Sequence, residues 1–194
     1  MTQSEATPAQ PTPQERFTSL IVTLSRLVDG ATDHALPRGD ISALRREDGA
    51  RSPTFYKLAA LVLEDVMPAS PALREEAERR WARVVHLLAR TAGQHALSAP
   101  STGTALAEAE LAEPRFLRLL RAEGDAIDAT SRAALAPLVQ RAVTFDPRDL
   151  AALVLSAPHP KPSFHHEDGE RVRRRLARDF YRAAAKAESD TKRS

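Results

Sequence analysis

The stretch that decides the fold reads PALREEAERRWARVVHLLARTAG and spans residues 71–93. Its apolar side chains recur at steps of three and four, which is the period of one face of an α-helix. These side chains are Leu73, Ala77, Trp81, Val84, Val85 and Leu88. Ser70 and Pro71 supply a favoured start, because proline at the first helical position has no helical hydrogen bond to lose. The stretch predicts a long helix that buries one face and stops near Gly93.

The same helical period extends outward from this stretch in both directions. Upstream it predicts a helix over residues 15–28 that ends at Gly30, a short helix capped by Asp40, and a third from Ser52 to Pro68. Downstream it predicts helices near residues 106–112, 115–122, 131–142, 147–155 and 170–187. No stretch shows sustained alternation with β-branched residues. The sequence therefore predicts an all-α, two-lobed helical bundle of about eight or nine helices.

A connection that contains Ser, Pro and Gly, residues 94–103, is the predicted boundary between the two lobes. The N-terminal lobe is expected at residues 15–93 and the C-terminal lobe at 104–187. Residues 1–14, rich in Pro, Thr and Gln, and residues 188–194 are predicted to be disordered tails.

Composition excludes several classes of protein. The chain has no cysteine, which excludes disulfides, a thiol nucleophile and thiolate zinc sites, and which favours a reducing, cytoplasmic compartment. No apolar run approaches the roughly 20 residues that a membrane-spanning helix needs. Neither a glycine-rich phosphate loop nor a G-x-S-x-G motif is present. We therefore expect no catalytic residues, no cofactor and no membrane association.

The net charge is only +2, but the positive charge is concentrated locally. Guanidinium groups suit phosphate, because they donate paired hydrogen bonds and stay protonated. Three basic clusters stand out: Arg45, Arg46, Arg51 and Lys57; Arg115, Arg118 and Arg121; and Arg171, Arg174, Arg175, Arg178 and Arg182. If folding joined them into one groove, they would follow a nucleic-acid backbone. Most aromatic residues occupy apolar-face positions, so binding is expected mainly to phosphate.

The alternative interpretation of the last helix is a solvated face. Glu170, Asp179 and Glu188 would then be the intrahelical partners of its arginines. A metal site at His165 and His166 is a further alternative, but consecutive loop residues rarely converge on one ion. The ordinary interpretation of that loop is that Asp168 caps the last helix.

Five motifs carry a resemblance to a known family. They are SALRR at 42–46, PTFYKL at 53–58, TGTAL at 102–106, RFLRLLRA at 115–122 and VRRRLARDFY at 172–181. In order and spacing they resemble the CasB small-subunit family of type I-E CRISPR Cascade. The similarity extends over about residues 20–181.

The resemblance implies a non-catalytic subunit with two copies head to tail in Cascade, beside the other subunits, the guide RNA and the target DNA strands. Its task would be to bind single-stranded nucleic acid and stabilise the R-loop. Arg45 and Arg46 match the family's paired arginines, and Arg74, Arg132, Arg141 and Lys161 fall near its basic positions. The runner-up function is a helical adaptor or regulator whose basic helix binds an acidic protein surface.

Overall fold

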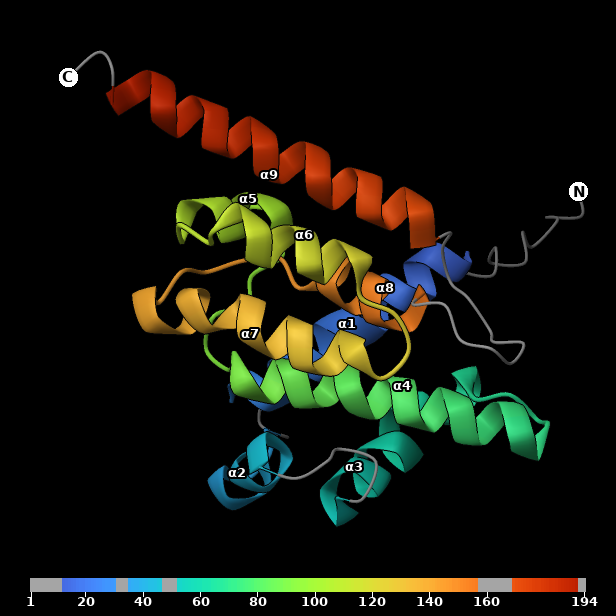
Figure 1. Ribbon diagram of the computed structural model, residues 1–194. Coiled ribbons are helices and arrows are strands. Elements are labelled where there is room, and N and C mark those ends of the chain that lie inside the picture. The colour runs from blue at the N-terminus through green and yellow to red at the C-terminus, as the bar shows by residue number, and fades with distance from the viewer. Residues whose placement is uncertain (1–11, 31–34, 47–51, 157–168, 192–194) are drawn as a thin grey trace, which may run out of the picture.

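The computed structural model describes residues 12–30, 35–46, 52–156 and 169–191, and within these residues the regular structure is helical, with no β-strand (Figure 1). The α-helices are α1 (Pro13–Asp29), α2 (Arg38–Arg46), α3 (Pro53–Leu58), α4 (Pro71–Arg90), α5 (Thr102–Glu108), α6 (Glu113–Arg121), α7 (Ala126–Arg141), α8 (Arg148–Ser156) and α9 (Gly169–Thr191). A π-helix, η2 (Ala59–Leu63), and a 3₁₀ turn, η3 (Glu64–Val66), follow α3. The predicted all-α bundle is confirmed.

The first helix begins earlier than its apolar period indicated. Thr12 caps it by accepting a hydrogen bond from the backbone N–H of Glu15 at 3.3 Å, and the Glu15 carboxylate accepts one from the Thr12 N–H at 2.7 Å. This reciprocal capping box satisfies two backbone donors and sets the start at Pro13. Pro13 and Gln14, expected in a disordered tail, are therefore helical. Gly30 ends the helix with a φ of 74°, as predicted.

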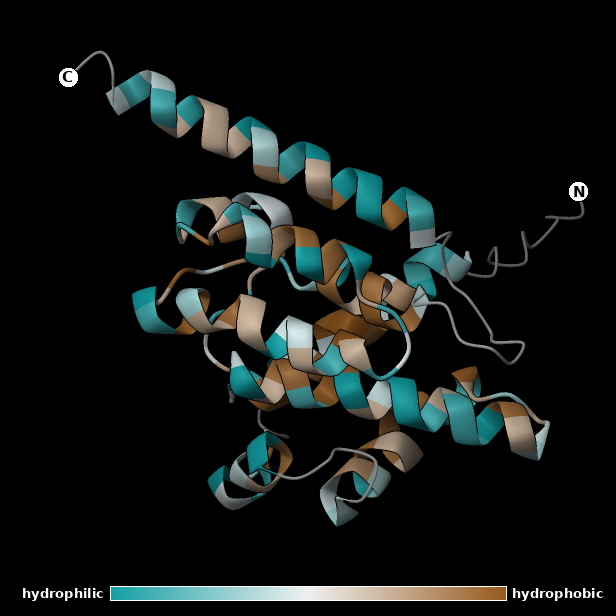
Figure 2. Ribbon diagram, in the orientation of Figure 1, coloured by the Kyte–Doolittle hydropathy of each residue, from teal (hydrophilic) through white to brown (hydrophobic). Residues whose placement is uncertain are grey.

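The long helix α4 lies at the centre of the bundle, where α1, α2, α7 and α8 pack against it (Figure 1). Trp81 and Val85 are fully buried, and Val84 and Leu88 nearly so. Figure 2 shows the hydrophobic colour gathered where these helices meet and the hydrophilic colour along the outer side of α9. The apolar face of α4 is therefore buried at the centre of the core, as the sequence predicted.

A buried ion pair on α4 was not foreseen. Arg80 and Glu76 are both buried, and the Arg80 Nε donates to Glu76 Oε1 at 2.7 Å. The Arg80 Nη1 donates to the backbone oxygen of Leu155 at 2.5 Å, which ties α4 to the end of α8. A charge this deep is tolerated because it is both paired and hydrogen-bonded.

The predicted helix from Ser52 to Pro68 is real but irregular. Its α-helical part ends at Leu58, and a π-helical turn, which contains an extra residue, follows. Around this turn Leu63 is fully buried, Val62 is partly buried against the core, and Leu61 is 81 % exposed.

The connection at residues 94–103 runs beside the segment before α8. His95 pairs with Phe145 and Ser101 with Asp146 as isolated parallel bridges, and the Ala96 N–H donates to the Phe145 oxygen at 3.1 Å. The buried apolar side chains of all nine α-helices belong to one continuous cluster within the described residues. The division into two lobes stays a prediction.

The last helix, α9, crosses the top of the bundle as drawn in Figure 1 and packs mainly on α5 and α8. It continues to Thr191, so residues 188–191 are helical rather than part of a tail. Gly103 of α5 permits the close approach, since an added Cβ would lie 2.5 Å from the Leu176 oxygen.

Candidate nucleic-acid interface

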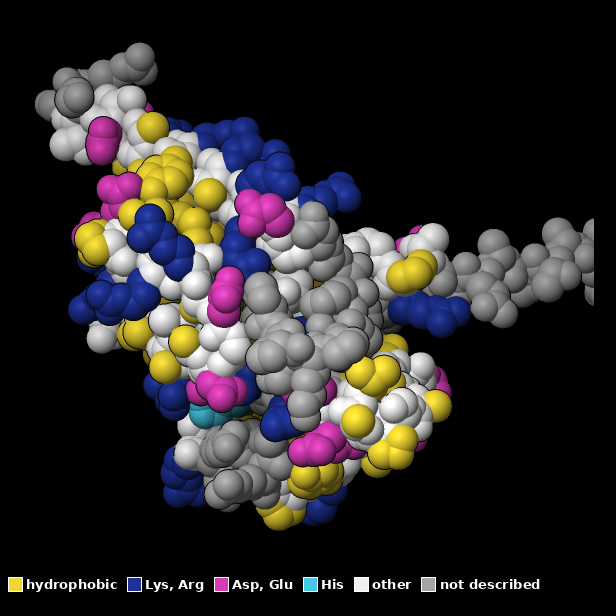
Figure 3. Space-filling view, turned by 45° about the vertical axis from the view of Figure 1, so that its right-hand side comes forward, with side chains coloured by type: hydrophobic (Ala, Val, Ile, Leu, Met, Phe, Trp, Pro, Cys, Tyr) yellow, Lys and Arg dark blue, Asp and Glu magenta, His cyan; other side chains and the backbone are white. Residues whose placement is uncertain are grey.

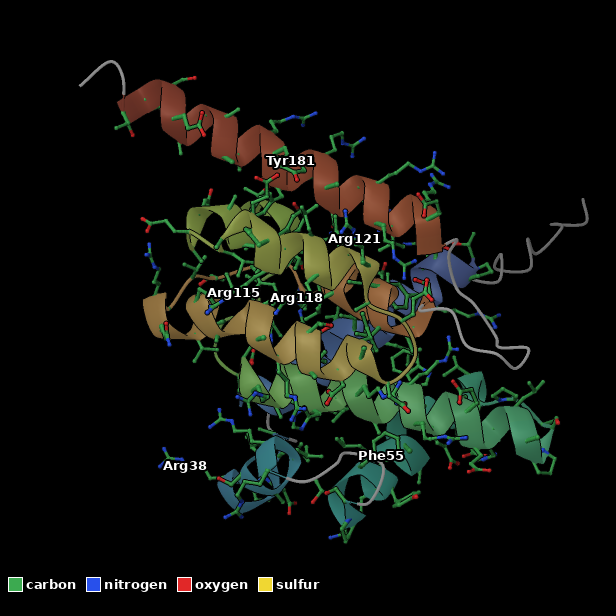
Figure 4. The ribbon with its side chains drawn as sticks, in the orientation of Figure 1. Arg38, Phe55, Arg115, Arg118, Arg121 and Tyr181 are labelled. Atoms are coloured by element: carbon green, nitrogen blue, oxygen red, sulfur yellow. The ribbon has the colours of Figure 1, made fainter. Side chains whose placement is uncertain are left out.

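Helix α6 presents three arginines to solvent, at the spacing that the sequence predicted. Arg115, Arg118 and Arg121 are exposed, whereas Phe116 and Leu119 are buried beneath them (Figure 4). Among the residues that the structure describes, these three guanidinium groups have no ion-pair partner. They therefore offer unneutralised positive charge to an external anion.

Helix α9 forms a second basic surface. Arg171, Arg174, Arg175 and Arg178 line one hollow of about 540 Å³. Arg175 is partly neutralised, because its Nη2 lies 2.6 Å from Asp149 Oδ1. Burial is the largest cause that raises the pKa of the Asp149 carboxyl, and the Arg175 guanidinium opposes the rise.

Two other arginines of this hollow keep most of their exposure. The Arg174 side chain is 72 % exposed and only 3.8 Å from Glu170, and the Arg178 side chain is 61 % exposed and 3.4 Å from Asp179. Exposed pairs at these distances are weak and screened by salt. The solvated-face interpretation therefore applies in part, since carboxylates accompany these arginines without burying them.

Helices α6 and α9 lie against each other in antiparallel order, so these two basic clusters lie on adjoining helices. The rings of Phe116 and Phe180 stack with centroids 3.8 Å apart. At the other end of α6, the Arg173 Nε donates to the Leu120 oxygen at 2.7 Å. We define the α6–α9 face as the surface of Arg115, Arg118, Arg121, Arg174 and Arg178. Figure 3 shows dark-blue side chains above and below a yellow apolar band on this side of the molecule.

The predicted cluster on α2 and α3 lies away from α6 and α9. Arg45 and Arg46 on α2 and Lys57 on α3 are exposed, but α2 and α3 occupy the end of the molecule opposite α9 (Figure 1). The Arg45 Nε donates to the Ala89 oxygen at 2.6 Å, so this arginine also fastens α2 to α4. Arg90, the next residue of α4, adds an exposed guanidinium that sequence reasoning missed. The structure thus places two basic clusters on adjoining helices and the third at the opposite end of the molecule (Figure 1).

Three arginines carried over from the resemblance are engaged by carboxylates. Arg141 lies 2.6 Å from Glu110. Its hydrogen bond holds the pKa of the Glu110 carboxyl below the usual range. The other two arginines form three pairs: Arg74 with Glu64 at 2.5 Å and with Glu78 at 3.1 Å, and Arg132 with Asp128 at 3.1 Å. Such arginines offer a phosphate less than unpaired ones do, because an existing partner must be displaced.

The histidine-rich loop and Lys161 lie outside the described residues, so the expectations for Lys161, His165, His166 and Asp168 are neither supported nor opposed. Within the described ranges no group of three or more His, Asp and Glu side chains is placed to hold a metal ion. None of the described helices is long and apolar enough to cross a membrane.

Tyr181 and Arg173 are features of this face that sequence reasoning did not single out. Tyr181 follows the buried Phe180 and is therefore rotated by about 100° from the apolar side of the helix. It is 42 % exposed. Arg173 falls within the arginine-rich run, but only the packing shows that it donates to backbone oxygens of α6 rather than facing solvent.

Comparison with known proteins gives one match. The model of the family described as CRISPR-associated protein Cse2 matches residues 40–181. No curated protein and no solved structure matches the chain.

Proposed function

Because the chain belongs to the CRISPR-associated Cse2 family, the CasB family of the resemblance above, we propose that it is the non-catalytic small subunit of a CRISPR Cascade surveillance complex. In this role it binds single-stranded nucleic acid and stabilises the R-loop. Its partners are the other Cascade subunits, the guide RNA, the target DNA strands and a second, head-to-tail copy of itself, in the cytoplasm.

The observation that carries the proposal is the α6–α9 face. Five exposed arginines from two antiparallel helices lie there. Those of α6 have no ion-pair partner among the described residues, and Arg174 and Arg178 have only weak pairs with Glu170 and Asp179. Phosphate contacts of this kind release condensed counterions, so they give affinity without reading sequence.

That type of binding suits an R-loop. The heteroduplex that forms is about as stable as the duplex it replaces, so a few phosphate contacts on an opened strand shift the balance toward the open state. Sequence recognition is left to base pairing, and the subunit needs no base-specific contacts.

The test is titration of the full chain with single-stranded DNA across a salt series. We expect the affinity to fall steeply with salt, and to fall at constant salt in the Arg118→Ala variant. Arg118 is a cleaner choice than Arg178, because Arg178 lies beside the Asp179 carboxylate. Affinity that is the same at low and moderate salt would refute the proposal.

Copurification distinguishes this proposal from the alternative function, an adaptor that binds an acidic protein. Copurification with guide RNA and the remaining Cascade subunits supports the proposed function. Copurification with a protein partner alone, in the absence of any nucleic acid, would favour the adaptor instead.

A further inference from the structure

Tyr181 is the exposed member of the aromatic group where α9 crosses α6. Its side chain is 42 % exposed, whereas Phe116 is fully buried and Phe180 is 4 % exposed. The sequence has only one other tyrosine, Tyr56. Tyr181 thus presents aromatic surface to solvent within the α6–α9 face (Figure 4).

The ring is fixed in place before any ligand arrives. The Tyr181 hydroxyl donates to Glu113 Oε1 at 2.7 Å. The ring stands edge-on to Phe116 at 6.1 Å and to Phe180 at 5.5 Å between centroids. Since the hydroxyl and the ring edge are both held, binding to the exposed part costs little side-chain entropy.

Cations surround this ring. The bond to Glu113 raises the pKa of Tyr181, and the Arg121 guanidinium is near enough to oppose the shift. Arg178 lies one turn earlier on α9 and points to the same side of the helix. Phosphates held by Arg121 and Arg178 would therefore bring a base near Tyr181.

The neighbouring surface of α6 is also suited to a base. A hollow of about 720 Å³ is lined by Pro114, which follows the Glu113 that holds Tyr181, by Leu117 and by the acidic Glu123. Arg118 and Arg121 lie on the same hollow. Apolar surface between cations is the arrangement by which single-strand-binding proteins take bases and phosphates together.

We propose that Tyr181 stacks on one nucleobase of the bound strand while Arg118, Arg121 and Arg178 contact the flanking phosphates. This inference rests on the proposed function and adds an apolar contribution that salt does not screen. It adds a base contact to the expectation that binding is mainly to phosphate. Because every base has an aromatic face, the contact tolerates any sequence.

The experiment compares two labelled strands of equal length and charge, a thymidine homopolymer and its abasic counterpart, by fluorescence anisotropy at fixed salt. We expect the wild-type chain to bind the thymidine strand about fivefold or more tightly than the abasic strand, as stacking of one base predicts. The comparison needs no variant, so it does not depend on the folding of a mutant.

Variants then test whether Tyr181 causes the preference for the thymidine strand. Tyr181→Leu should abolish the preference, whereas Tyr181→Phe, which keeps the ring, and Tyr56→Leu, the matched exposed tyrosine on α3, should retain it. Equal wild-type affinity for both strands, or a preference that persists in Tyr181→Leu, would overturn the inference and leave the proposed function intact. Absence of salt-dependent binding to either strand would refute both.

Discussion

Replacement of the three α6 arginines should weaken binding and change its salt dependence together. Arg115, Arg118 and Arg121 have no ion-pair partner among the described residues. For single strands each phosphate contact contributes about 0.7 to the slope of log K against log salt. Loss of three contacts in the triple Gln variant therefore predicts a slope smaller by about 2, and an affinity about a hundredfold lower near ~0.1 M salt.

The matched control removes the same charge from the paired arginines. Arg74, Arg132 and Arg141 each bond to carboxylates, so their triple replacement by Gln should leave the slope nearly unchanged. Exposed pairs stabilise little, so both variants should fold, which circular dichroism checks. Anisotropy titrations with a labelled single strand, from about 50 to 200 mM salt, give the slopes.

Comparison of the two triple variants shows whether binding depends on the α6 arginines or on the net charge of the chain. If both lowered the slope equally, net charge rather than the α6–α9 face would govern binding. If neither did, α6 would lie outside the site, and the α2–α3 cluster of Arg45, Arg46 and Lys57 would be the remaining candidate.

Three further predictions concern the fold that positions this face. Arg80→Met leaves a buried carboxylate without its main partner and should lower the free energy of unfolding by about 3–5 kcal/mol, measured by urea titration of the fluorescence of the single buried tryptophan. Gly103→Ala should cost about 1–3 kcal/mol, because α9 must move away, whereas Gly39→Ala, with open space around it, should not. The Glu110 carboxyl should titrate below the usual glutamate pKa in an NMR titration and return toward it in Arg141→Gln. Because this pKa is lowered by folding, the stabilisation is present above about pH 4.3 and is lost as pH falls, and an unshifted pKa in the wild type would contradict the ion pair.

The helices could be predicted because their signals are local. The apolar stripe around Trp81 and the Gly30 stop each lie within a few turns of chain. The π-helical turn at Ala59–Leu63 was missed, since the same apolar residues fit a regular helix equally well. Burial of Arg80 was missed for a related reason, because its backbone acceptor, Leu155, lies far away in sequence.

The candidate site shows the same limit. Arg132 and Asp128 are four residues apart on one helix, so their pairing could be anticipated from the sequence. The pairing of Arg141 with Glu110 joins different elements and could not. Sequence identifies which side chains are cationic, but only packing decides which of them remain without partners. The exposure of Tyr181 likewise depends on packing, so it was identified only from the structure.

The backbone bridges between residues 95–101 and residues 145–146 restrict how the two ends of the molecule move relative to each other. A flexible connection would let the two ends of the chain move independently, whereas these two backbone bridges and the shared core hold the described parts together. This arrangement sets the offset between the α2–α3 end and the α6–α9 end. Under the proposed function, adjustment during strand opening would fall to the neighbouring subunits rather than to this one.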